Sequence, residues 1–115
     1  MPGINEIYRL RDNNASLTME VNIGYAAKAA TIVKLDGKPQ NGLFIDSFRY
    51  ETGTDTDLNG KELDIITMVN KIISGNDNSS VTITLRGGYE DATFLIKDHS
   101  TLNPVDFRAT ITLIL

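Results

Sequence analysis

The ten residues from Ser16 to Tyr25 alternate between apolar side chains and polar or small ones. The apolar set is Leu17, Met19, Val21, Ile23 and Tyr25, separated by Ser16, Thr18, Glu20, Asn22 and Gly24. Successive side chains of a β-strand point to opposite faces of a sheet, so this period of two predicts a strand with one buried and one solvated face. Because later segments repeat the preference for β-branched residues between clusters of Gly, Asn and Asp, we expect an all-β chain.

The spacing of these segments predicts the architecture. We expect about seven or eight short strands, separated by turn-forming residues roughly every ten positions. The segments lie near residues 4–10, 16–25, 31–35, 43–52, 63–73, 81–85, 93–97 and 107–115. Such a rhythm is typical of a small antiparallel two-sheet β-sandwich, with a closed β-barrel as the alternative architecture.

Residues 62–74 fit two kinds of element. At helical spacing, Leu63, Ile66 and Ile73 fall on one stripe, whereas in a strand Leu63, Ile65 and Val69 share a face. Six of the eleven positions 63–73 are β-branched, and such side chains lose rotamer freedom in a helix. We therefore expect a strand here, and a helix would change the class to α+β.

The segment after Asp36-Gly37 is harder to place. Asp-Gly is a favoured two-residue hairpin turn, but Pro39 follows at once and cannot donate a hydrogen bond to a central strand. We therefore expect a longer connection over residues 36–42 than a tight hairpin would need.

Composition limits the classes of protein that remain. A length of 115 residues is close to the commonest size of one domain, so we expect residues 1–115 to form a single sandwich. The chain has no cysteine, which excludes a disulfide scaffold, a thiolate zinc site and a cysteine nucleophile. No apolar stretch approaches the length of a membrane span and no secretory signal is visible, so we expect a cytoplasmic protein without a membrane partner.

The charge distribution argues against nucleic acid as a partner. The formal net charge is -4, from 11 basic and 15 acidic residues, and the basic residues are scattered along the chain. Binding to phosphate backbones requires a clustered basic surface. We therefore expect a protein partner, self-association or a small ligand instead.

No catalytic set of residues can be recognised. The single histidine, His99, stands in Asp98-His99-Ser100, but neighbours along the chain do not form a triad unless nucleophile and base meet in space. The carboxylates show no spacing that favours paired acid-base chemistry. We expect no enzyme, no catalytic residues and no organic cofactor.

One motif carries the chemistry of a metal site. Asp55-x-Asp57-x-Asn59-Gly60 places oxygen-bearing side chains at alternate positions before a glycine, as in the first half of a calcium loop. The twelfth position, which holds a bidentate Glu in an EF-hand, is Ile66 here. The motif predicts a structural calcium site, and the alternative is a type I′ turn at Asn59-Gly60 flanked by solvated aspartates.

The remaining function classes are both binding functions. The first is a non-catalytic structural or protein-interaction module of a larger or homo-oligomeric assembly. Its predicted interface is the apolar run at Ile111, Leu113 and Leu115, which is otherwise a central strand covered on both faces. The second is a carbohydrate- or small-ligand-binding sandwich, in which Tyr89, after Gly87-Gly88, is the candidate exposed aromatic platform.

Overall fold

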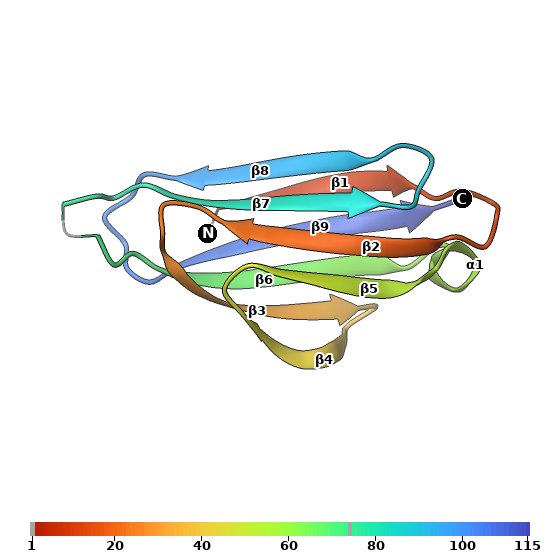
Figure 1. Cartoon of the computed structure of the whole chain (residues 1–115), viewed down its shortest axis with the longest axis horizontal. Helices are drawn as coiled ribbons and strands as arrows, with labels where there is room; N and C mark the ends of the chain where they lie inside the picture. The colour runs from red at the N-terminus through yellow and green to blue at the C-terminus, as the bar shows by residue number, and fades with distance from the viewer. Residues whose placement is uncertain (1, 74) are drawn as a thin grey trace.

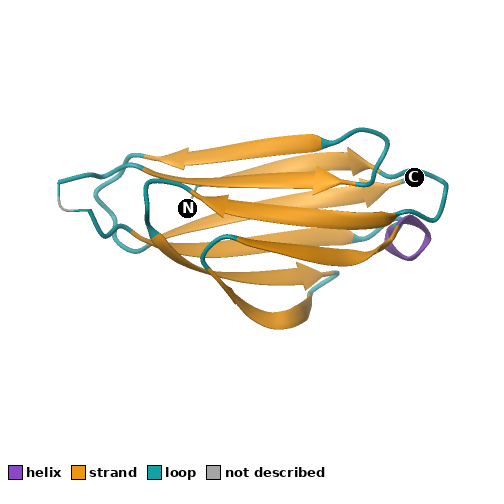
Figure 2. Cartoon of the chain, viewed as in Figure 1, coloured by secondary structure: helices purple, strands orange, loops and turns teal. Residues whose placement is uncertain are grey.

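Nine β-strands and one short helix are found in the described residues, 2–73 and 75–115, of a computed structural model. The elements are β1 Gly3–Arg9, β2 Ser16–Ile23, β3 Lys28–Leu35, β4 Lys38–Ile45, β5 Phe48–Thr54, α1 Asp55–Leu58, β6 Glu62–Asn70, β7 Ser79–Arg86, β8 Ala92–Asp98 and β9 Val105–Ile114. The predicted all-β class is confirmed. Figure 2 shows the strands filling the molecule and α1 at one end.

The strands form two sheets that lie face to face (Figure 1). One sheet has five strands in the order β1-β9-β6-β3-β4, and the other has four in the order β5-β2-β7-β8. Neighbouring strands run antiparallel except β1 and β9, which pair in parallel with Gly3 opposite Arg108 and Arg9 opposite Ile114. The sheets do not close on themselves, so the sandwich prediction is confirmed and the barrel alternative is wrong.

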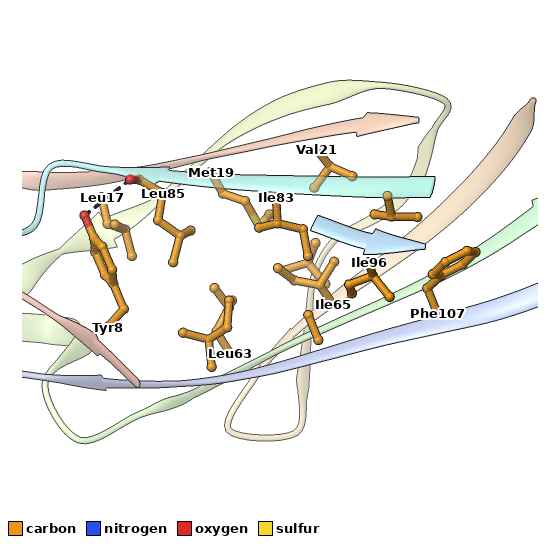
Figure 3. Packing of buried hydrophobic residues seen from close by; sticks show 14 of the residues in the cluster. Tyr8, Leu17, Met19, Val21, Leu63, Ile65, Ile83, Leu85, Ile96 and Phe107 are labelled. Carbon is orange, nitrogen blue, oxygen red and sulfur yellow. Dashed lines mark hydrogen bonds between the residues drawn. The ribbon is translucent and has the colours of Figure 1, made fainter. Parts of the chain in front are cut away.

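The core lies between the two sheets and follows the period of two. In β2, Leu17, Met19 and Val21 are buried, and they face the buried side chains of the other sheet, such as Leu63 of β6 and Phe107 of β9. Figure 3 shows these side chains meeting between the two layers. Burial of apolar side chains from both sheets is the main stabilising contribution to this fold.

Residues 62–70 form a strand, so the α+β alternative is wrong; residue 74 of that predicted segment lies outside the described residues. Leu63, Ile65, Thr67 and Val69 are buried on one face of β6. The buried Thr67 hydroxyl shares a hydrogen bond of 2.9 Å with the Thr31 hydroxyl of β3, so each of these buried groups has a partner. No described helix is long or apolar enough to span a membrane.

The connection after β3 is a tight two-residue hairpin, and the longer connection predicted from Pro39 is wrong. Leu35 pairs with Lys38, and Asp36 and Gly37 adopt positive φ values of 48° and 80°. Pro39 is accommodated because β4 is an edge strand, where one side of the backbone faces solvent and needs no ladder donor. The single strand predicted over residues 43–52 is therefore divided between two strands, β4 and β5.

The turn between β2 and β3 places two consecutive non-glycine residues in the left-handed region. Tyr25 and Ala26 have φ values of 58° and 53°. Since a Cβ atom disfavours this region, we expect Ala26→Gly to raise the free energy of unfolding by about 0.5 to 1 kcal/mol, after the added unfolded-state entropy of glycine is subtracted. Urea unfolding measures the change. The matched control is Ala30→Gly in β3, which should lower stability, and a loss at Ala26 as large as at Ala30 would contradict the strain.

Candidate functional site

The carboxyl-terminal strand β9 lies inside the five-stranded sheet, between β1 and β6. Ile111 and Leu113 point into the core and are 0% exposed. This corrects the predicted interface, because these two side chains have no surface to offer a partner. Only Leu115, just beyond β9, is exposed, and its backbone N–H donates to the side-chain oxygen of Asn59 at 3.0 Å.

The aspartate motif begins in helix α1, where Asp55 links α1 to the loop before β2. Asp55 is buried, and its carboxylate accepts hydrogen bonds from the backbone N–H groups of Asn13 at 2.9 Å and of Thr56 at 2.7 Å. Burial acts to raise the pKa of Asp55, but these hydrogen bonds outweigh it and the net shift is downward. The alternative in which this aspartate is simply solvated is therefore wrong.

The other two residues of the motif also have protein partners. Asp57 accepts a hydrogen bond from the Thr54 hydroxyl at 3.2 Å. Asn59, with φ -57° and ψ 126°, precedes Gly60 at φ 81°, which defines a type II turn and corrects the predicted type I′ turn. Within residues 2–73 and 75–115, no three His, Cys, Asp or Glu side chains are grouped as metal ligands. Calcium binding by Asp55, Asp57 and Asn59 stays a prediction.

Tyr89 lies on the surface between β7 and β8, with 57% of its area exposed. The guanidinium carbon of Arg9 lies 4.7 Å from the centre of the Tyr89 ring. The backbone N–H of Tyr89 donates to the Arg9 carbonyl at 2.9 Å. Tyr89 and Arg9 line a surface hollow together with Glu90 and Asp91. The exposure fits the predicted aromatic platform, while ligand binding there stays a prediction.

Tyr8, which lines the same hollow as Tyr89, has a structural role. The Tyr8 hydroxyl donates to the Glu90 carbonyl at 2.7 Å and accepts from the backbone N–H of Gly88 at 3.0 Å. Burial raises the pKa of Tyr8, so the hydroxyl stays protonated and keeps its donor. A Cβ atom at Gly88 would collide with the Tyr8 ring, which explains why glycine occupies this position.

The histidine segment gives no sign of a triad. The His99 ring nitrogen contacts the Asn78 side chain, whereas the Ser100 hydroxyl donates to Asp98 at 2.7 Å. Asp98 in turn accepts from the Lys71 ammonium group at 3.1 Å. The hydrogen bonds of these residues therefore connect loop to loop and do not link the serine to the histidine.

Sequence reasoning missed an apolar patch on the outer face of the five-stranded sheet. The apolar patch consists of Ala30 and Ile32 of β3, Leu43 and Ile45 of β4, and Ile66 and Met68 of β6. The strand register makes it continuous, because Ile32 lies opposite both Leu43 and Ile66, and Ala30 opposite both Ile45 and Met68. Ile32, Leu43, Ile45 and Met68 are between 39% and 62% exposed.

Charged side chains border the apolar patch. Arg108 of β9 donates two hydrogen bonds to the Asp64 carboxylate of β6, at 3.3 and 3.1 Å. The Thr110 hydroxyl donates to the same carboxylate at 2.8 Å. Burial acts to raise the pKa of Asp64, but the contacts from Arg108 and Thr110 outweigh it and lower the pKa overall. Lys34, opposite Asp64, adds a positive charge to this border.

The outer face of the four-stranded sheet has a different character. Glu20 lies at its centre and forms ion pairs with Arg49 at 3.1 Å and Arg86 at 2.8 Å. Hydrogen bonds from Asn22, Arg86 and Arg49 lower the pKa of Glu20 to about 2, so this face is charged at neutral pH. The contiguous exposed apolar side chains thus lie on the outer face of the five-stranded sheet, and the centre of the other outer face is charged.

No protein-family model matches this chain, and neither the curated proteins nor the solved structures compared with it give a match. The fold itself defines the class of protein: a nine-stranded, two-sheet β-sandwich over the described residues. Its candidate functional regions are the apolar patch and the hollow beside Tyr89.

Proposed function

We propose that the protein is a non-catalytic structural or interaction module that works by assembling with a protein partner. The observation that carries the proposal is the apolar patch, where four large apolar side chains are exposed side by side on one sheet face. Isolated apolar side chains are normal on a protein surface, but a contiguous group rimmed by polar residues is typical of an interaction site.

The composition of this surface favours a protein as the occupant. Leu43, Ile45 and Met68 form an apolar centre, and the Asp64 and Arg108 pair supplies both signs of charge at its border. Protein interfaces combine a centre depleted in charge with a polar rim in this way. With a net charge of -4, the chain lacks the excess of positive charge that nucleic acid would favour.

The first test is the solution mass, measured by light scattering on a size-exclusion column across micromolar concentrations. We expect a discrete oligomer, and we expect Leu43→Lys to weaken it about tenfold or more, because an ammonium group would be buried in the apolar centre. Leu102→Lys is the matched control, since Leu102 is as exposed as Leu43 but lies in the loop before β9.

Each outcome separates the alternatives. Loss of the oligomer with Leu43→Lys but not with Leu102→Lys supports assembly through the apolar patch. If neither substitution changes the oligomer, the assembly function still stands, but the apolar patch is not its interface. A monomer at every concentration would instead favour the ligand-binding alternative over assembly. In that alternative Tyr89 is the platform, and Asp55, Asp57 and Asn59 hold a calcium ion.

A further inference from the structure

The two sheets have four edge strands, β1 and β4 in one sheet and β5 and β8 in the other. An edge strand presents unpaired backbone N–H and C=O groups to any extended segment that approaches it. Proteins block unwanted pairing with proline, bulges, charged side chains such as lysine along the edge, or charges that point toward the core side. These devices therefore indicate which edges are closed to a partner.

On three of the four edges such a device lies before the last two residues of the strand. In β4, Pro39 lacks a donor, and the register with β3 shifts at Asn41 and Gly42, both with positive φ. In β5, the register with β2 shifts so that Thr52 has no opposite residue. In β1, Glu6 has the same parity as the buried Tyr8 and directs a carboxylate toward the core side of the edge.

In β8 such devices are confined to the last two residues, Lys97 and Asp98, and none lies within Ala92 to Ile96. Its register with β7 runs without a shift from Ala92 opposite Leu85 to Asp98 opposite Ser79. The strand contains no proline or glycine, and its first five residues, Ala92 to Ile96, are uncharged. Among the described strands β8 pairs with β7 alone, so its other side is open at the rim of the sandwich (Figure 1).

The side chains of β8 also lack cover on the open side. Leu95 points outward and is 52% exposed. Phe94 points toward the core but is only partly buried, since no strand of its own sheet lies beyond it. An additional strand along β8 would cover both side chains and pair the free backbone groups.

We propose that β8 pairs antiparallel with β8 of a second copy of this chain, around a two-fold axis at Leu95, to form one continuous eight-stranded sheet. The inference rests on the proposed assembly function and names a partner for it, but it uses an edge that is separate from the apolar patch. Either can therefore fail without the other.

The residue order of β8 is complementary to itself about Leu95. The axis places Leu95 of one copy opposite Leu95 of the other, and Phe94 opposite Ile96, so that apolar side chains meet on both faces. Lys97 meets Thr93, and Asp98 meets Ala92, so no like charges are opposed. A two-fold axis at Ile96 would instead set Phe94 opposite Asp98, and one at Phe94 would leave Lys97 and Asp98 without partners inside the strand.

Single-cysteine variants test this register directly, because the chain has no cysteine of its own. Opposite residues of antiparallel strands have Cα atoms about 4.5 to 5.5 Å apart, a separation that a disulfide bond spans. We expect Leu95→Cys to form a covalent dimer in most of the protein under mild oxidation at micromolar concentration. The matched controls are Ile7→Cys in β1 and Leu102→Cys in the loop before β9, which place an exposed thiol away from both β8 and the apolar patch and should give little covalent dimer.

A charge variant gives a second, reversible measurement. Leu95→Lys sets two ammonium groups opposite each other and should weaken the dimer tenfold or more, and mixing it with Leu95→Glu should restore a mixed dimer by pairing opposite charges. Equal cross-linking at positions 95, 7 and 102, or a dimer that Leu95→Lys leaves unchanged, would overturn the pairing. If Leu43→Lys disrupts an oligomer that Leu95→Lys leaves intact, the assembly function stands and this inference fails; a monomeric wild type overturns it as well.

Discussion

Replacement of Phe107 by alanine is expected to lower the free energy of unfolding by about 3 to 5 kcal/mol. Phe107 is a large, fully buried side chain of β9, and it lies where both sheets contribute to the core (Figure 3). Its removal forfeits the transfer free energy of the ring and leaves a cavity that rigid β-strands fill only in part. Denaturant unfolding at neutral pH measures the loss as a lower midpoint at unchanged slope.

A smaller change at the same position tests whether the loss of stability comes from the cavity or would follow any substitution of Phe107. Phe107→Leu keeps most of the volume and should cost less than half as much as Phe107→Ala. A further control is Leu102→Ala, at an exposed loop position, which should change stability by less than about 0.5 kcal/mol. Equal losses for Phe107→Leu and Phe107→Ala would show that the cavity is not the cause.

Replacement of Asp98 by alanine is expected to cost about 3 kcal/mol or more at neutral pH. The side chain of Lys71 is only 6% exposed, and its ammonium group donates to the Asp98 carboxylate at 3.1 Å and to the Ser100 carbonyl at 2.6 Å. Without the carboxylate, the ammonium charge is left buried without a counter-ion. Urea unfolding of the single variant Asp98→Ala and of the double variant with Lys71→Met measures the effect, and the double variant should recover part of the loss because the buried charge is gone.

The pH dependence of this loss has a defined sign. Burial acts to raise the pKa of Asp98, but hydrogen bonds from Ser100 and Lys71 outweigh it and lower the pKa in the folded state. A carboxyl group with a lowered folded pKa stabilises the protein above its unfolded pKa of about 3.9, and loses that contribution as the pH falls through the folded value. The stability gap between wild type and Asp98→Ala should be full at pH 7 and narrow below about pH 4. A gap that does not change with pH would show that the ion pair is not its source.

The strands were predicted from the sequence because their patterns are local. Ser16 to Ile23 alternates with a period of two and forms β2, and the β-branched run around Ile65 and Thr67 forms β6 as expected. The tight hairpin at Asp36-Gly37 was not predicted, because the prediction assumed that Pro39 lies in a central strand, where its missing N–H would break the ladder. Whether proline is tolerated depends on the position of its strand in the sheet, which is a tertiary property.

The candidate surfaces were predicted less well for the same reason. Ile111 and Leu113 form an apolar run whether their strand is at an edge or inside a sheet, and only the sheet order places β9 between β1 and β6. The apolar patch had a local signal, since Leu43 and Ile45 are apolar on the parity opposite to that of Phe44. That they join Ile32 and Met68 depends on the register of three strands, which the sequence does not state. Tyr89 could be recognised because an aromatic residue after two glycines is a local feature.

The parallel pair β1 and β9 joins segments from opposite ends of the described chain, with Gly3 opposite Arg108. β9 is also the strand that connects β1 to β6, so β1 has no partner in its own sheet until β9 has been synthesised. Contacts between residues so far apart in sequence carry a large loop-closure entropy and are made late and slowly. On the ribosome, the five-stranded layer must therefore be completed after translation of β9, and the nascent chain exposes the core face of its first strand until then.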